Sequence, residues 1–385
     1  MFSSRLRWDL RPNKLSALLE AKRLAEAAIL DLTESNPTRA GLSYPAEAIL
    51  EALADRRSLV YEPHPAGHAE ARSAVAGYYR RRGHDIAPER ILITASTSES
   101  YAYLFKLFAD PGDEVLAPRP SYPLFEFLAG LESVRIVQYP LVYHGSWSVD
   151  LEALERSISD RTRAVVVVNP NNPTGSFLKK HELARLSEIC AQRQLPIISD
   201  EVFADYAFRP DPQRVETLAA SGEVLTFSLS GLSKICGLPQ MKLGWIVAGG
   251  PGADAALEKL ELIADTYLSV GTPVQHALPR FLEEGKAVQE QIARRVCGNL
   301  DALRAAVAGS ACQVLDVEGG WYAILRVPRT RSEEEWVLEL LDKENVLAQP
   351  GFFYDFDSEA FLVLSLLTPP DIFRQGVSRV LALAG

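Results

Sequence analysis

The chain alternates short runs of β-branched residues with longer stretches whose apolar residues recur at helical spacing. This pattern is typical of crossover units on a mostly parallel sheet, because parallel neighbours need a long connection that usually contains a helix. The run at 164–169 has no polar alternation, as expected of a central strand buried on both faces. Seven strands are predicted, at residues 91–94, 114–117, 134–138, 164–169, 196–199, 224–228 and 243–248.

Helices are predicted between these strands, on both faces of the sheet, at residues 97–109, 122–130 and 178–192. After residue 285 the pattern changes to a long helix followed by short strands, which indicates a smaller α+β domain. A chain of 385 residues is also longer than one core usually supports. We therefore expect a large α/β domain at 41–285 and a smaller domain formed by 1–40 and 286–385.

Charge and apolar pattern argue against two classes of partner. Lys and Arg total 40 while Asp and Glu total 50, and the resulting charge of -10 opposes nucleic acid and anionic membranes. No apolar run approaches the roughly 20 residues of a membrane span, and no signal peptide is recognisable, so we expect a cytoplasmic location. His64 and His68 are separated by Pro65 and Gly67, which break the helix that such ligand spacing needs, so no metal site is expected.

Lys234 lies in a polar, Gly-rich loop directly after an apolar strand, flanked by Ser230 and Ser233. Most lysines are solvated at the surface, and that is the ordinary explanation for any one of them. A partly desolvated amine at a strand end, however, has a lowered pKa and can attack an aldehyde. Lys234 is therefore a candidate nucleophile.

Two more polar residues follow strands of the same predicted sheet. Asn172 lies in the turn NPNNPTG, and Asp200 ends the strand PIISD. Each has an ordinary explanation, as a turn amide or a helix N-cap. Because open α/β sheets bind ligands at the carboxyl ends of their strands, we also expect Asn172 over a planar polar ring and Asp200 against a protonated ring nitrogen. The tight turn suggests a cis peptide bond at Asn172-Pro173.

The turn TASTSES at 94–100 links a strand to a helix, whose free N–H groups and dipole favour an anion such as phosphate. Helix capping alone also selects such residues, so an ordinary N-cap is the alternative. The candidates for a phosphate site, from this turn and from the lysine loop, are Ser96, Thr97, Ser98, Ser230, Ser233 and Lys242.

Together the motifs resemble the pyridoxal-phosphate enzymes of the aspartate aminotransferase superfamily, fold type I, class I/II. The resemblance covers most of the chain, from SNPTRAGL and YEPHPAG through PSYPLF, NPNNPTG, SDEVF and SGLSK to GGWYAIL and QPGFFY. It implies that Lys234 forms the internal aldimine and moves a proton between substrate and cofactor, while Asp200 pairs with the pyridine nitrogen.

The resemblance also implies roles for the other candidates. Asn172 would hydrogen-bond the ring's phenolic oxygen, Tyr122 would stack on the ring, and Ser96, Thr97, Ser98, Ser230 and Ser233 would hold the phosphate. In the family a tyrosine matching Tyr61 reaches the phosphate of the neighbouring subunit, which implies a homodimer with a shared active site.

The function implied is an aminotransferase that moves an amino group from an amino acid to a 2-oxo acid through the Lys234 aldimine. A lyase, decarboxylase or racemase on the same scaffold is the alternative, because geometry about the α-carbon decides which bond breaks. A non-catalytic module that binds the cofactor for regulation is a further alternative.

Three residues depart from the family's pattern. Phe203 stands where a tyrosine usually donates to the ring oxygen, and Lys242 replaces a phosphate-binding arginine. Val363 stands where the family has the arginine that binds the substrate's α-carboxylate. Either another arginine, with Arg39 as a candidate, takes over that contact, or the substrate differs.

Overall fold

The computed structural model describes residues 2–9 and 11–385, and its largest element is an eight-stranded sheet. The strand order is β2-β9-β8-β7-β6-β3-β4-β5, and the strands from β8 to β4 in that order run parallel. β9 is antiparallel to β2 and β8, and β5 is antiparallel to β4. The strands are β2 (Ile91–Thr94), β3 (Glu114–Arg119), β4 (Arg135–Tyr143), β5 (Trp147–Val149), β6 (Thr162–Val168), β7 (Ile197–Asp200), β8 (Thr226–Gly231) and β9 (Gly244–Gly249).

All seven predicted strands lie in this sheet, and β5 adds an eighth at its edge. With three residues, β5 is too short to show a periodic pattern in the sequence. The run at 164–169 forms most of β6, which lies between β7 and β3 and is buried along nearly its whole length.

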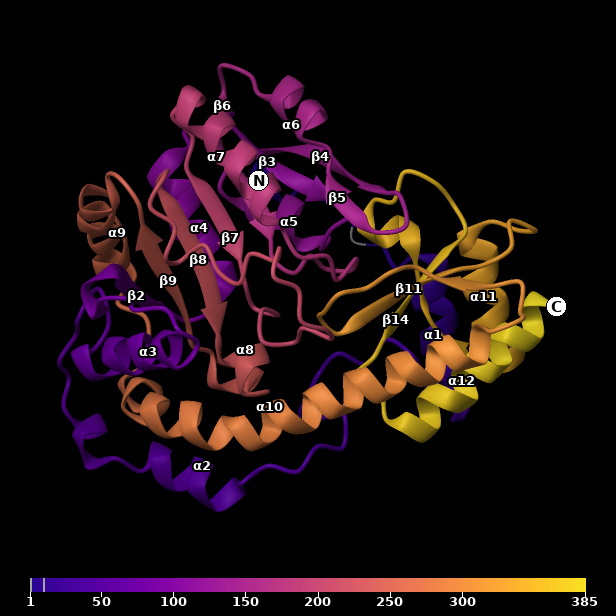
Figure 1. Ribbon diagram of the computed structural model, residues 1–385. Coiled ribbons are helices and arrows are strands. Elements are labelled where there is room, and N and C mark those ends of the chain that lie inside the picture. Colours follow the sequence, from indigo (N-terminus) through magenta and orange to yellow (C-terminus); the bar gives the residue numbers. More distant parts are fainter. Residues whose placement is uncertain (1, 10) are drawn as a thin grey trace.

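Helices cover both faces of the large sheet, as predicted (Figure 1). Helices α4, α5 and α9 pack on one face over buried residues such as Val166 and Phe227. Helices α6 and α7 pack on the other face over Val165 and Ile197, while α2, α3 and α10 cover the part near β2 and β9. Their bounds are α2 (Ala46–Leu53), α3 (Ala69–Arg81), α4 (Thr97–Phe108), α5 (Leu124–Leu131), α6 (Leu151–Ser157), α7 (Lys180–Arg193), α8 (Leu232–Ile235), α9 (Ala253–Tyr267) and α10 (Thr272–Val307).

A second sheet, of order β10-β11-β14-β13, is antiparallel throughout, and β1 pairs with β12 in a separate two-stranded ribbon. One face of this sheet packs on α10, α11 and α12 in a common core that also contains Leu15 and Leu32 from the first forty residues. These elements are α1 (Lys14–Leu24), β1 (Leu30–Asp31), β10 (Gln313–Val314), β11 (Tyr322–Arg326), α11 (Glu333–Glu344), β12 (Val346–Leu347), β13 (Gln349–Pro350), β14 (Phe361–Ser365) and α12 (Pro370–Ala384).

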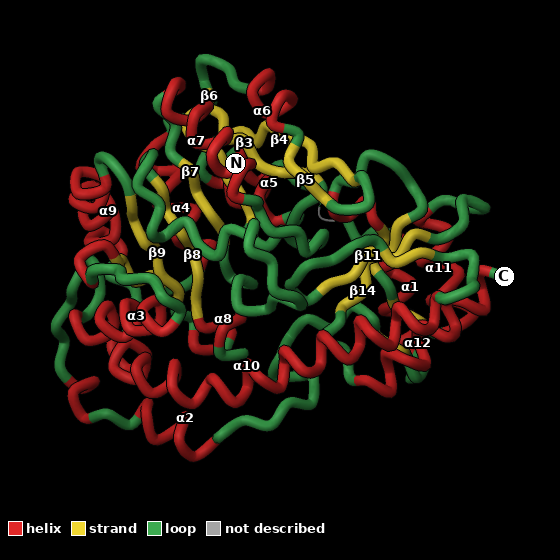
Figure 2. Tube along the Cα trace, in the orientation of Figure 1, coloured by secondary structure: helices red, strands yellow, loops and turns green. Residues whose placement is uncertain are grey.

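The helix α10 is 36 residues long and runs from the large sheet to the small one (Figure 1). It passes residue 285 without a break, so the division of the chain into domains at that point stays a prediction. Loops gather between the larger and the smaller group of strands (Figure 2). In the described part of the chain, no helix combines the length and apolar character that crossing a membrane requires.

Candidate active site

Two adjacent parallel strands bring Asp200 and Lys234 to one edge of the large sheet. Asp200 ends β7 and pairs with Leu229 of β8, which continues to Gly231 and turns directly into α8 with Lys234. Each charge affects the other: the Lys234 ammonium lowers the pKa of Asp200, and the Asp200 carboxylate raises the pKa of Lys234. Both residues therefore lie at the carboxyl ends of adjacent strands, close enough for their charges to interact.

Lys234 is an amine held in partly apolar surroundings. Its Nζ lies 4.9 Å from the ring centroid of Trp321 and 5.5 Å from that of Phe203. Burial lowers the pKa of Lys234 to about 8, because the charged form loses hydration, and Asp200 only partly opposes this shift. The hydroxyl of Tyr206 donates to the Lys234 backbone carbonyl at 2.6 Å and fixes the turn. A substantial fraction of the amine is thus neutral near pH 7 to 8, as a nucleophile requires.

Asp200 is a carboxylate with one donor on each oxygen. The Val202 backbone N–H donates to Oδ1 and the Tyr101 hydroxyl donates to Oδ2, both at 3.2 Å. Burial raises the pKa of Asp200 to about 6, while both hydrogen bonds act to lower it. A cationic ring nitrogen placed beside this carboxylate would favour its ionised form further.

The turn 169–176 divides its asparagines between two tasks. Asn169 is structural, since its amide donates to Val215 O at 2.9 Å and accepts from Leu178 N at 3.0 Å. Asn171 donates to Pro120 O at 3.0 Å and ties the turn to the loop before α5. Asn172, only 8% exposed, keeps a buried Oδ1 without a partner among the described residues. The Asn172-Pro173 peptide is cis, as suggested by the sequence.

The predicted phosphate turn begins α4. Ser96 is its N-cap, with Oγ accepting from the Glu99 N–H at 3.2 Å, so for this residue the capping explanation holds. Thr97 and Ser98 are half-buried in the first turn, where backbone N–H groups lack helical acceptors. Gly244 joins this turn to the lysine loop, because a Cβ there would lie 3.0 Å from Ser230 O and 3.2 Å from the Ser96 carbonyl carbon. The structure therefore brings the two predicted halves of the phosphate site together.

Buried polar atoms without partners gather around this edge. Among the described residues they include Ser121 Oγ, Asn172 Oδ1, Ser230 Oγ and Trp321 Nε1. Tyr122 follows Ser121 and is 45% exposed, and its pKa is raised by partial burial and by the charge of Asp200. Unpaired buried polar groups are costly unless a ligand or water satisfies them. A ring with a phosphate and a phenolic oxygen fits this set of donors and acceptors.

Two predicted site residues, Tyr61 and Lys242, are exposed in the single chain. Tyr61 is 80% exposed, in the loop between α2 and α3. Lys242 is exposed at a left-handed position two residues before Gly244, and Ser233 is half-buried beside Lys234.

The small sheet contains Val363, the third departure from the family's pattern, and we call the side of the site that it forms the small-sheet wall. Val363 of β14 is fully buried and pairs with Ile324 of β11 and Gln349 of β13, so these three side chains share one face. Ile324 packs with residues of the large sheet, which shows that this face is turned toward it. Two residues along, Ser365 Oγ donates to Glu34 O at 2.6 Å. Where the family's arginine would lie, this wall is apolar or neutral.

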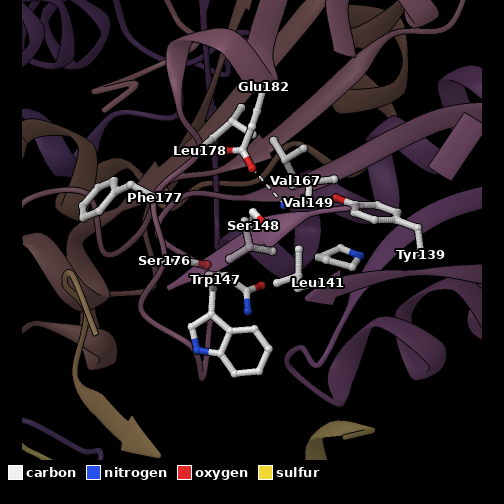
Figure 3. Close-up of a pocket in the computed structure, with 13 residues that line it drawn as sticks. Tyr139, Leu141, Trp147, Ser148, Val149, Val167, Ser176, Phe177, Leu178 and Glu182 are labelled. Atoms are coloured by element: carbon white, nitrogen blue, oxygen red, sulfur yellow. Dashed lines mark hydrogen bonds between the residues drawn. The ribbon is translucent and has the colours of Figure 1, made fainter. Parts of the chain in front are cut away.

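A separate cavity lies beside β4, β5 and β6 (Figure 3). Its space of about 20 Å³ suffices for one water molecule. Trp147 Nε1 and Asn171 Oδ1 line it without partners in the described chain, and Glu182 accepts from the Val149 N–H at 2.9 Å. Neither Lys234 nor Asp200 lines this cavity, so it is not where the nucleophile acts.

Sequence reasoning missed two tyrosines that support the site. Tyr101 looks like an ordinary apolar-face residue of α4, and Tyr206 follows the SDEVF motif without any signal of its own. Only tertiary packing places the first hydroxyl on Asp200 and the second on the backbone of Lys234. Their spacing from the motifs gives no local pattern from which to predict these contacts.

Comparison with known proteins gives a consistent result. The family model "Aminotransferase class I and II" matches residues 27–372. Glutamate-pyruvate aminotransferase AlaA of Escherichia coli is 29% identical over 372 residues, 92% of this chain and 91% of that protein. An aminotransferase structure from Escherichia coli, 26% identical, superposes with a TM-score of 0.85 over 100% of this chain and 98% of the other. The alanine aminotransferase of Pyrococcus furiosus, 23% identical, has the same fold, with a TM-score of 0.88 over 100% and 99% of the two chains.

Proposed function

We infer the function from one premise: the chain belongs to the aminotransferase class I and II family and has its fold type I architecture. It is an aminotransferase, and its named relatives favour amino-group transfer over the lyase, decarboxylase, racemase and non-catalytic alternatives. We propose that it binds pyridoxal 5'-phosphate at Lys234 and moves an amino group from an amino acid to a 2-oxo acid. The observation that carries this proposal is that Asp200, at the end of β7, and Lys234, just after β8, lie at the carboxyl ends of adjacent strands and shift each other's pKa.

When bound, pyridoxal phosphate supplies an aldehyde that exchanges amines and a ring that withdraws electrons from the substrate's α-carbon. In this chain Lys234 would hold it covalently, and its low pKa suits it to take up and return a proton at Nζ. Asp200 would bind the ring nitrogen, Asn172 the phenolic oxygen, and Tyr122 the ring face. The phosphate would be held by Ser96, Thr97, Ser98, Ser230, Ser233 and Lys242.

A homodimer is part of the proposal. Tyr61 follows two apolar residues, Leu59 and Val60, which are 84% and 61% exposed. Contiguous exposed apolar side chains are typical of a surface that binds another protein. We propose that this loop packs on a second copy of the chain and that Tyr61 reaches the partner's phosphate site. A cytoplasmic location belongs to the same proposal and is supported by four free thiols, Cys190, Cys236, Cys297 and Cys312.

Arg39 is the proposed replacement for the missing carboxylate clamp. It lies in the loop between β1 and α2, after Glu34, whose backbone carbonyl accepts from Ser365 Oγ, and before Tyr44. The Tyr44 hydroxyl donates to Gly237 O at 2.7 Å, three residues after Lys234. Arg39 is exposed and forms no ion pair with any described residue, so its guanidinium is free to bind a substrate carboxylate.

The direct test is a screen of amino donors and 2-oxo acceptors, with glutamate and pyruvate first because the Escherichia coli relative bears their names. The purified protein with pyridoxal phosphate should show a visible absorbance band that a donor bleaches and an acceptor restores. Turnover that needs no acceptor and releases ammonia or carbon dioxide would instead establish a lyase or a decarboxylase.

A further inference from the structure

We propose that Tyr101 is a positioning residue, which holds the Asp200 carboxylate in place against the cofactor's ring nitrogen. This inference rests on the proposed function, because it concerns the same site. The Tyr101 hydroxyl donates to Oδ2 of Asp200 at 3.2 Å, and the Val202 N–H donates to Oδ1 at 3.2 Å. A carboxylate accepts about four hydrogen bonds, so both oxygens keep a free lone pair for a ring N–H.

The Tyr101 ring is fixed, so its hydroxyl has one available direction. Tyr101 is 2% exposed, and its ring stands edge-to-face on Phe125, with centroids 5.3 Å apart at 78°. Phe105 lies on the same helix with its centroid 5.9 Å away. Because the packing is aromatic on these sides, loss of the hydroxyl would remove a donor from Asp200 without moving the ring.

The position of Tyr101 on α4 links the two ends of the proposed cofactor site. Thr97 of the phosphate turn is four residues earlier, one helical turn away. The same rigid helix therefore supplies the N–H groups proposed to hold the phosphate and the donor that fixes Asp200. This arrangement ties the position of the carboxylate to the end of the site where the phosphate would bind.

The charged and titratable groups that act on Asp200 show why an extra donor matters. Burial and the neighbouring Glu201 carboxylate raise the pKa of Asp200, while the Val202 N–H, the Tyr101 hydroxyl and Lys234 lower it. The charge of Asp200 in turn helps to raise the pKa of Tyr122, in the loop before α5. Glu201 is fully engaged, accepting from Ser199, Thr217, Ser228 and the Leu218 N–H. The pKa of Tyr101 lies well above its ordinary value, so its hydroxyl keeps its proton and stays a donor.

The test compares Tyr101→Phe with Tyr103→Phe in the full-length protein reconstituted with ¹⁵N-labelled pyridoxal phosphate. Tyr103 is the matched control, because it lies on the same helix, is equally buried, and its hydroxyl lies 3.4 Å from Ser269 Oγ instead. The ¹⁵N chemical shift of the ring reports whether the nitrogen is protonated. We expect the nitrogen of Tyr101→Phe to lose its proton at a pH lower by about one unit, and cofactor affinity to fall about tenfold. Tyr103→Phe should match the wild type.

A second background separates positioning from general packing. In Asp200→Asn, removal of the Tyr101 hydroxyl should change cofactor affinity no further, because the charge on which it acts is gone. Equal losses in both backgrounds, or a ¹⁵N titration of Tyr101→Phe that matches the wild type, would overturn the role of Tyr101. If the wild type itself binds no pyridoxal phosphate, the proposed function fails instead, and the two failures are distinguishable.

Discussion

The two walls of the candidate site differ in how they are built. The large sheet contributes Lys234, Asp200 and Asn172 from strand-to-helix turns, and each turn has a short recognisable motif. The small sheet contributes Val363 through strand pairing with Ile324, 39 positions away in the sequence, and with Gln349. The first wall carries the residues that we propose bind the cofactor, with Phe203 and Lys242 departing from the family's pattern, while the second has Val363 where that pattern has an arginine. Under the proposed function, this chain keeps the cofactor contacts of one wall and changes the substrate contacts of the other.

The largest expected effect comes from the cofactor wall. Lys234→Ala removes the amine proposed to bind the cofactor and to move the proton, so activity should fall by about 10³-fold or more and the visible band should disappear. Absorbance and turnover measure both. Lys259→Ala, a change at an exposed lysine of α9, is the matched control and should keep both. Retention of the band by Lys234→Ala would contradict the assignment.

Asp200→Asn should stabilise the cofactor-free protein above about pH 6. Burial raises the pKa of Asp200 from 3.8 to about 6, so the native state binds the proton more tightly than the unfolded chain. The stabilisation of the native state by protonated Asp200 is fully present below pH 3.8 and is lost as the pH rises through 6. This loss is about 3 kcal/mol. The asparagine avoids this loss. Urea unfolding at pH 4 and pH 7.5 should show a gain for Asp200→Asn only at the higher pH, and an equal effect at both would contradict the raised pKa.

Arg39→Gln tests the wall that departs from the family. If Arg39 binds the substrate carboxylate, the KM for a 2-oxo acid should rise roughly 10- to 100-fold, because a charge-assisted pair is lost, while kcat changes little. Steady-state kinetics with one acceptor at several concentrations measures this split. Arg39→Lys should recover part of the affinity. An unchanged KM in Arg39→Gln would show that the carboxylate is bound elsewhere or is absent from the substrate.

The smallest expected effect is that of Phe203→Tyr, which restores the family's residue on the cofactor wall. Phe203 is 4% exposed and packs edge-to-face on Trp321, with centroids 5.3 Å apart. A phenol here would donate to the ring oxygen and favour its anionic form, so the pKa of the lysine-bound cofactor should fall. A pH titration of the visible band measures the shift. An upward shift, or none, would show that the phenol does not reach that oxygen.

Local patterns predicted most of the fold, since the strands and helices of the large sheet have strong periodicity and clear turn residues. They also placed Lys234 and Asp200 at one edge, because the carboxyl ends of parallel strands must meet there. Contacts that depend on tertiary packing gave no such signal. Tyr101 and Asp200 are 99 positions apart in the sequence, and the residues around Tyr101 indicate only that it belongs to a helix. The edge strand β5 was missed because its three residues are too few to show a periodic pattern.

The central claim is that one amine, Lys234, holds the cofactor. Reduction of the protein with sodium borohydride in the presence of pyridoxal phosphate makes that linkage permanent, and mass spectrometry of the peptides then locates it. We predict a single modified peptide, the one containing Lys234. Modification at another of the ten lysines, or no stable adduct at all, would contradict the account.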